Sequence, residues 1–206
     1  MALRIGAPIC RPHVCSCGTF ADELGHHGLS CQRSAGRHPR HTELNKILCQ
    51  ALTSIHFNAT LEPPGLFRDD GRTPDGLTLV PWFRGRYLVW DSTCGDTLAP
   101  SYINISCRQA GRTAELASSI KHRKYSEFDR NIHIFNAFAV ETLGPWSTDA
   151  LLLFNKIGPK LNEISGDSRS QEYLLQRISL AIQRANASSI LSTIPFSTKL
   201  DQVFYL

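Results

Sequence analysis

The stretch CSCGTFADELGHHGLSC, at residues 15–31, constrains the fold more than any other part of the sequence. The first 40 residues are rich in Cys, His, Gly and Arg and show hardly any periodic apolar pattern. A segment of this composition folds around a metal ion or does not fold. Three thiolates and one imidazole can satisfy a tetrahedral zinc ion. The sequence therefore predicts a structural zinc site whose ligands are Cys15, Cys17, His27 and Cys31.

The spacing leaves alternatives for this site. Three residues separate His27 from Cys31 and four separate His26 from it, and Cys10 and His13 are substitute ligands. The chain has seven cysteines and begins without the charged head and apolar run of an export signal, which favours metal over a disulfide framework. The Cys-x-Cys half is tighter than the usual two-residue gap. The other interpretation is a flexible leader with unrelated, reduced cysteines.

The rest of the chain predicts an α/β fold, a small mixed sheet flanked by helices. The expected order is a helix at 41–55, strands at 58–63, 76–80 and 86–94, a helix at 108–128, a strand at 131–144, and helices at 147–164 and 168–190, the last capped by Ser168. We divide the chain into a zinc knuckle with a basic linker (1–40), a core (41–145) and a helical extension packed on the core (146–206).

Composition sets only broad limits on function. A hydrophobic fraction of 42% is enough for a packed core, and 19% charged residues do not suggest disorder. The net charge of +4 is compatible with a polyanionic partner but does not demand one. No apolar stretch approaches the roughly 18 residues that a membrane span needs, so we expect no membrane partner and an intracellular protein.

Two aspartates stand at the ends of neighbouring predicted strands. Asp75 follows Pro74 and begins the strand at 76–80, while Asp91 lies near the end of the strand at 86–94. A hairpin can bring the two carboxylates side by side, and hard oxygen ligands suit Mg²⁺ or Mn²⁺. Such an ion can polarise a phosphodiester and lower the pKa of an attacking water. The alternatives are that Asp75 caps a turn and that Asp91 pairs with an arginine.

The helix at 108–128 has two lysines on its apolar side. Lys121 and Lys124 fall within the same arc as Ala114, Leu116 and Ile120. An inward lysine is costly unless it meets an anion, although its stem can also run along the surface and leave the charge in water. The pattern favours a site shared by the lysines and the aspartates.

The motifs TPDG, WDST and KHRKY resemble the PD-(D/E)XK nuclease superfamily, in the form found in the restriction-like endonuclease domain of non-LTR retrotransposons. Those domains have a Cys-Cys-His-Cys knuckle, then an arginine–histidine pair that opens a helix, then the nuclease core. This chain has its Cys/His cluster, then RHTELN, then the predicted core, in the same order. The resemblance implies a restriction-endonuclease-like core and metal-dependent nicking of DNA at an insertion site.

The resemblance also implies roles for single residues. Asp75 and Asp91 would be the acids that bind Mg²⁺ or Mn²⁺. Thr93 occupies the position of the usual catalytic lysine, and Lys121, followed by Tyr125, would replace it as in the retrotransposon branch, with Lys124 as the second candidate. A reverse transcriptase domain or element RNA would be supplied elsewhere, and the protein would be nuclear. The alternative is a catalytically inactive, zinc-stabilised DNA-binding or scaffold domain derived from such an element.

A run of basic residues follows the knuckle: Arg33, Arg37, Arg40 and His41. Basic side chains next to a small zinc module suit the phosphate backbone, with salt-sensitive and weakly specific binding. The alternative is a solvated linker.

Overall fold

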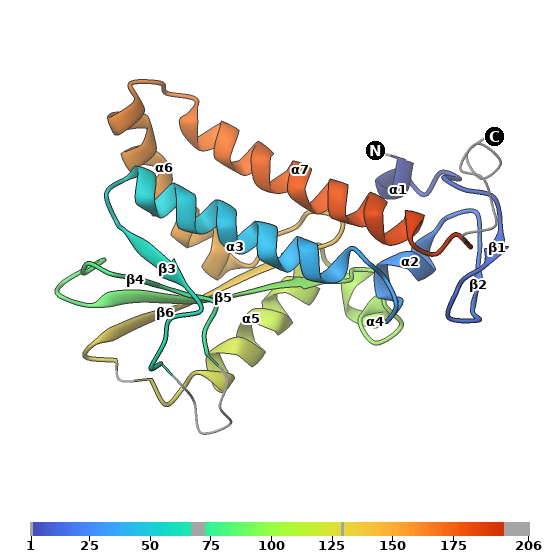
Figure 1. The fold of residues 1–206 in the computed structure, drawn as a ribbon, viewed down its shortest axis with the longest axis horizontal. Helices are drawn as coiled ribbons and strands as arrows, with labels where there is room; N and C mark the ends of the chain where they lie inside the picture. Colours follow the sequence, from blue (N-terminus) through green and yellow to red (C-terminus); the bar gives the residue numbers. More distant parts are fainter. Residues whose placement is uncertain (1, 67–72, 129, 196–206) are drawn as a thin grey trace.

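The computed structural model describes residues 2–66, 73–128 and 130–195 (Figure 1). Its centre is a four-stranded sheet in the order β3-β4-β5-β6. These strands are Ala59–Leu61, Gly76–Thr78, Tyr87–Gly95 and His133–Glu141. β3, β4 and β5 pair antiparallel, and β5 pairs parallel with β6. The predicted mixed sheet flanked by helices is confirmed.

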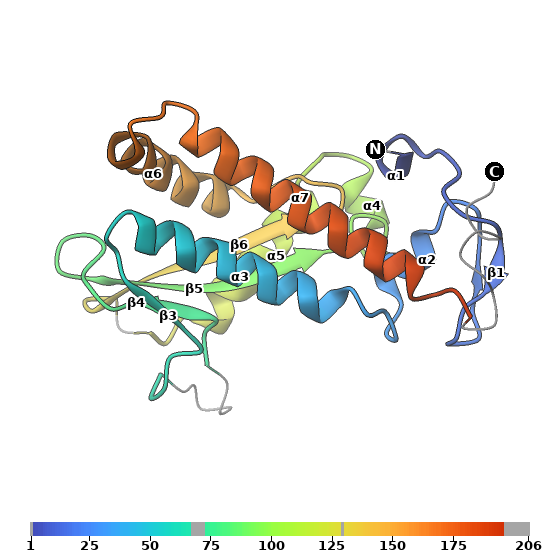
Figure 2. The ribbon, with the colours of Figure 1, turned by 45° about the horizontal axis from the view of Figure 1, so that its top comes forward.

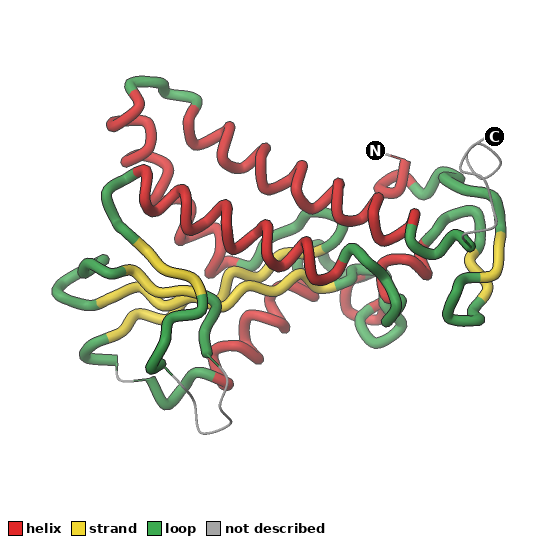
Figure 3. The backbone as a smooth tube through the Cα atoms, viewed as in Figure 1, coloured by secondary structure: helices red, strands yellow, loops and turns green. Residues whose placement is uncertain are grey.

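Helices cover both faces of the sheet, as Figure 3 shows. α3 (Arg37–Ser54), α6 (Thr148–Ser165) and α7 (Ser170–Leu191) lie on one face, and α5 (Arg112–Lys124) lies on the other. A parallel strand pair needs a crossover connection, and α5 provides it between β5 and β6. α3, α6, α7 and the sheet bury one shared hydrophobic core, which includes Leu48, Trp90, Phe138, Phe154 and Ile178.

Several helix boundaries differ from the prediction. α3 begins at Arg37, before residue 41, so part of the expected basic linker is helical. α5 begins after Gly111, which has a φ of 84°, and ends at Lys124. α7 begins at Ser170, and Ser168 is not its cap. Instead the carboxylate of Asp167 accepts a hydrogen bond from the backbone N–H of Arg169 at 2.8 Å.

The inward face of α5 also differs from the predicted arc. Leu116 and Ile120 are 38% and 45% exposed, whereas Ala114 and Ser118 are buried. The buried row runs from Ala114 through Ser118, at helical spacing, toward Lys121 and Tyr125. The helix therefore turns a narrow row of small residues to the sheet, and Lys121 lies on that row.

The N-terminal segment contains short elements that the sequence did not predict: α1 (Ala2–Ile5), β1 (His13–Val14), β2 (Phe20–Ala21) and α2 (His26–Ser30). Figure 2 shows α2 beside the last turns of α7. The approach is so close that a Cβ at Gly28 would lie 2.9 Å from the Cα of Ile190.

α4 (Ile103–Ser106), between β5 and α5, was also not predicted. None of the helices in the described part of the chain combines the length and apolarity needed to cross a bilayer.

Candidate functional site

Cys15, Cys17, His27 and Cys31 come together in the N-terminal segment. Their ligand atoms all lie within 4.8 Å of one another. The Sγ atoms of Cys15 and Cys31 are 3.8 Å apart, which is the edge of a tetrahedron around zinc when Zn–S is about 2.3 Å. The Sγ of Cys17 lies 3.2 Å from Nε2 of His27, somewhat less than such an edge. This Cys₃His group could hold a structural zinc ion.

The local backbone explains why these four side chains converge. The N–H of Gly18 donates to the carbonyl of Cys15 at 2.8 Å, and the N–H of Cys15 donates to the carbonyl of Thr19 at 2.9 Å. This turn presents the first two thiols together, while α2 carries His27 toward Cys31. Hydrogen bonds from Thr19 lower the pKa of Cys17 to about 6, whereas burial raises the pKa of Cys31.

The substitute ligands lie elsewhere. Nε2 of His13 bonds to Oγ1 of Thr193 at 2.9 Å, which ties β1 to the residues just after α7. The thiol of Cys10 donates to the carbonyl of Asp22 at 3.4 Å. The cluster therefore takes its imidazole from His27, the histidine three residues before Cys31.

Asp91, in β5, is the centre of a second group of charged side chains. Its carboxylate is 4% exposed. Oδ1 pairs with Nζ of Lys121, while Oδ2 accepts from Nζ of Lys124 at 3.4 Å and from the hydroxyl of Tyr125. All three partners come from the last turn of α5 and the residue after it. The inward lysines of the sequence analysis thus meet an anion.

Asp75, just before β4, is held from the other face of the sheet. Its Oδ2 pairs with Nε2 of His41 on α3 at 2.9 Å and accepts the backbone N–H of Ser92 at 2.6 Å. Burial raises the pKa of Asp75, but the hydrogen bond and charge of His41 outweigh it and leave the pKa below its ordinary value of 3.8. The same bond raises the pKa of His41 above 6.5.

The two aspartates are neighbours along the sheet, although their partners come from opposite faces. The N–H of Asp75 donates to the carbonyl of Trp90 at 3.0 Å, and its side chain bonds to Ser92. Asp75 therefore contacts the residues on either side of Asp91. Among the described residues, the Cys₃His cluster is the one group of three or more Cys, His, Asp or Glu side chains drawn together tightly enough to suggest a metal site.

The predicted DNA-binding residues separate into three environments. Arg33 and Arg37 are exposed, and Arg33 donates to the carbonyl of Ser16 at 2.6 Å. His41 belongs to the Asp75 pair. Arg40 is only 4% exposed and donates to Oγ of Ser189 at 3.2 Å, so it is buried and does not lie beside Arg33 and Arg37 on the exposed surface. The reason is that α7 packs across the first turns of α3.

Asn45 is a site residue that the sequence analysis missed. It is 5% exposed, and its Oδ1 accepts from Nε1 of Trp90 at 3.0 Å and from the hydroxyl of Ser92. It also lowers the pKa of Asp75. His41 and Asn45 are four residues apart on α3, so one helix face carries both polar supports of Asp75. The polar pair His41 and Asn45, four residues apart in a predicted helix, was the sequence signal that could have identified Asn45.

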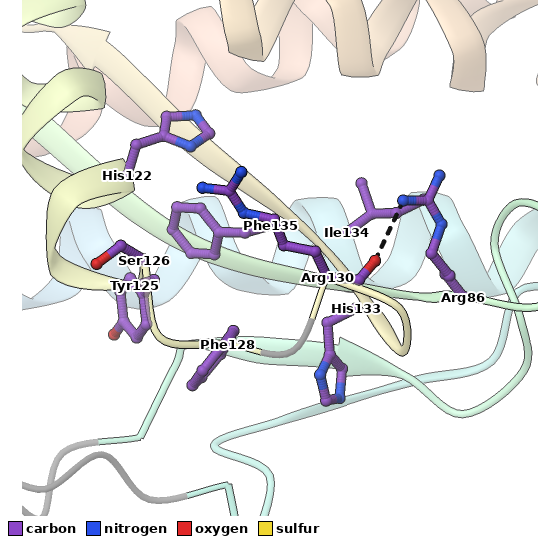
Figure 4. A pocket seen from close by; sticks show the side chains of 9 residues that line it. All are labelled: Arg86, His122, Tyr125, Ser126, Phe128, Arg130, His133, Ile134 and Phe135. Carbon is purple, nitrogen blue, oxygen red and sulfur yellow. Dashed lines mark hydrogen bonds between the residues drawn. The ribbon is translucent and has the colours of Figure 1, made fainter.

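Tyr125, which bonds to Asp91, also lines a cavity of about 390 Å³ (Figure 4). Its ring stacks on Phe135 with centroids 4.7 Å apart and lies next to Phe128. Across the cavity, the guanidinium of Arg86 donates to the carbonyl of Arg130. The rings fix Tyr125, which is 3% exposed, so that its hydroxyl points at Asp91.

The His41–Asp75 pair predicts a pH-dependent contribution to stability. Because the pKa of His41 is raised, its contribution is complete below pH 6.5 and disappears as the pH rises through the folded-state value. Because the pKa of Asp75 is lowered, its contribution is complete above pH 3.8 and disappears on acidification. His41 is 45% exposed, so we expect His41→Gln to cost only about 1 kcal/mol at about pH 6, and less at about pH 9.

Urea unfolding at the two pH values, without added divalent cations, measures this effect. His38→Gln is the matched control, because His38 is an exposed histidine on the same helix. A His41→Gln deficit that is as large at about pH 9 as at about pH 6 would show that the ion pair is not its source.

No protein-family model matches the chain, and a search of the curated proteins finds no significant relative.

Proposed function

We propose that this chain is a metal-dependent DNA endonuclease with a restriction-endonuclease-like core and a retrotransposon origin. The observation that carries the proposal is the Asp91 group: a buried carboxylate with two lysines and a tyrosine around it. A second carboxylate, Asp75, bonds to the residues that flank it. Acids, a lysine and a tyrosine in this arrangement match the motif order that resembles the PD-(D/E)XK superfamily.

The proposed ligands, two carboxylates, are of the type that a hard divalent cation prefers. Mg²⁺ keeps several waters and is often bound by one or two carboxylates plus substrate phosphates, so Asp75 and Asp91 would suffice as its protein ligands. When bound, Mg²⁺ or Mn²⁺ would polarise the scissile phosphodiester and make a water more acidic. Lys121 now neutralises Asp91, so its ammonium would have to leave the carboxylate and turn to the substrate.

The side chains on α5 then have distinct roles. Lys121 or Lys124 would hold negative charge that develops on the phosphate or on the attacking hydroxide. Tyr125 would orient Asp91 through its hydroxyl. His41 and Asn45 would keep Asp75 ionised and fixed in position. The packing of α3 and α5 against β5 would hold these groups around the two aspartates.

DNA would lie across the knuckle and the site. Arg33 and Arg37 are exposed near the Cys₃His group and would contact backbone phosphates. A reverse transcriptase domain or element RNA would act from elsewhere, on nuclear DNA. These partners rest on the family resemblance.

A catalytically inactive DNA-binding or scaffold domain is the second candidate. One observation favours it: Asp91 is already paired with two lysines, and such a compensated cluster can be purely structural. The two candidates predict the same fold and the same zinc site, so only an activity measurement separates them.

The test is a plasmid nicking assay with the purified chain. We expect supercoiled DNA to be converted to the open circular form with Mg²⁺ or Mn²⁺, and to remain supercoiled in buffer without divalent cations. Lys121→Ala should lower the rate strongly and weaken DNA binding slightly, because its charge also meets the phosphate. Absence of nicking with either cation, in protein that holds zinc and binds DNA, would favour the inactive domain.

A further inference from the structure

A cavity of about 830 Å³ lies between the first turns of α3, the end of β5 and the segment that leads to α4. We call it the α3 cavity. Its charged and titratable walls include Arg37, His38, Arg40, His41 and Asp96. Residues of the knuckle side, such as Ser30, line it too, and Thr93 and His41 join it to the Asp75–Asp91 region. The cavity thus borders residues next to both parts of the candidate site.

Arg40, which lines this cavity, is unusual because it is a buried arginine without a carboxylate partner among the described residues. The residue is only 4% exposed, yet no carboxylate of the described residues lies within ion-pair distance of it. Its guanidinium donates to the hydroxyl of Ser189 and, at 3.5 Å, to the thiol of Cys94. Its Nε is buried and has no hydrogen-bond partner among the residues that the structure describes. A buried arginine normally has an anion, because an unpaired charge in the interior is costly.

The charges around the cavity favour an anion as the missing partner. Two arginines and two histidines face one acid, Asp96, whose pKa is raised by burial. All four basic residues lie in the first two turns of α3, where the positive end of the helix dipole adds to their charge. The first turn contains no acidic residue, and Gly36 provides no side-chain cap.

We infer that the α3 cavity binds a phosphate group of a nucleic-acid strand, with the guanidinium of Arg40 as its main ligand. Arginine suits this task because its planar donors match phosphate oxygens. The cavity volume lies in the range of sites for whole small ligands and exceeds the needs of a lone anion, which favours a nucleotide unit. The assignment to DNA rests on the proposed function; the anion site itself rests on Arg40.

The inferred site would place a phosphate next to the candidate reaction centre. Arg40 and His41 are consecutive, and His41 holds Asp75. A strand whose phosphate lies in the α3 cavity would therefore present a neighbouring phosphodiester near Asp75 and Asp91. The cavity would thus determine which phosphodiester of the DNA strand lies at the two aspartates.

Fluorescence anisotropy with a short labelled DNA strand, without divalent cations, tests the inference. We expect Arg40→Gln to weaken binding by roughly 10- to 100-fold, which corresponds to the loss of hydrogen bonds to a charged group. Asp96→Asn should instead tighten binding, because it removes a negative charge from the cavity wall while Oδ1 can still accept from Leu98 and Thr142. Inorganic phosphate at matched ionic strength should compete in the parent chain.

Arg184→Gln is the matched control, since Arg184 is an exposed arginine outside the α3 cavity, and we expect little change. Should Arg40→Gln unfold, Ala99→Phe replaces it, because Ala99 lines the cavity and a ring there would block it. Unchanged affinity in folded Arg40→Gln or in Ala99→Phe would overturn the inference. Binding of inorganic phosphate but not of the strand would overturn the assignment to DNA. Because the assay omits divalent cations, it measures binding separately from nicking. A chain that does not nick DNA can therefore still show binding through Arg40.

Discussion

Asp91→Asn is expected to abolish nicking while the chain keeps its fold and its affinity for DNA. Asparagine has nearly the shape of aspartate but lacks the charge that a divalent cation requires. The loss also leaves Lys121 and Lys124 without their anion. Removal of one preorganised electrostatic group commonly lowers a rate by about 10²- to 10³-fold, and removal of a metal ligand should cost at least as much. The rate at which supercoiled plasmid becomes open circular measures the effect.

The affinity for DNA in the absence of metal should not fall with the nicking rate. Asp91 repels phosphate until a cation lies between them, so Asp91→Asn should bind DNA as tightly as the parent or slightly more tightly. Asp167→Asn is the matched control, because Asp167 also pairs with a basic residue, Arg169, but at the surface. Circular dichroism melting checks that the variants fold. Nicking by Asp91→Asn at the parent rate would mean that the activity belongs to another site or to a contaminant.

The second large effect concerns zinc. We expect one tightly held zinc per chain, lost in both Cys17→Ser and Cys31→Ser. Structural zinc sites contribute about 10–16 kcal/mol of apparent binding free energy, which greatly exceeds what the few apolar contacts of this segment can supply. Loss of the ion should therefore unfold β1, β2 and α2 and release the end of α7. Elemental analysis gives the metal content, and amide hydrogen exchange reports the unfolding.

The pH dependence of zinc binding provides a further check. Thiolates must lose their protons to bind, so the affinity should fall as the pH drops. Cys107→Ser is the control, because Cys107 is exposed and lies outside the cluster. Metal content that stays the same in Cys17→Ser and Cys31→Ser would show that the ligands lie elsewhere.

The sequence was most informative where the chemistry is local. Cys15, Cys17, His27 and Cys31 lie within one short span, so their types and spacing were enough to predict the cluster. The mixed sheet could be predicted as well, because its longer strands, β5 and β6, contain the apolar runs YLVW and AFAV. The inward position of Lys121 followed from helical periodicity, although the predicted arc wrongly included Leu116 and Ile120. Small residues, which carry little hydrophobic signal, form the contact face of α5.

The sequence was least informative where distant segments decide burial. The burial of Arg40 could not be predicted, because nothing near it in the chain shows that Ser189 lies against it. The pairing of His41 with Asp75 depends on how α3 lies against the start of β4, which a local pattern does not contain. Asn45 was missed for the same reason: its partners, Trp90 and Ser92, belong to a strand more than 40 residues away.

The adjacency of Arg40 and His41 on α3 has a thermodynamic consequence. A cation near Asp75 and a phosphate at Arg40 have opposite charges and share one rigid helical turn, so each should increase the affinity of the other. Linkage requires the two increases to be equal, and couplings of this kind are typically about 5- to 150-fold. The chain would then hold the divalent cation weakly on its own and firmly once a strand is present. DNA itself would thereby complete the metal site, which limits cleavage to the bound substrate.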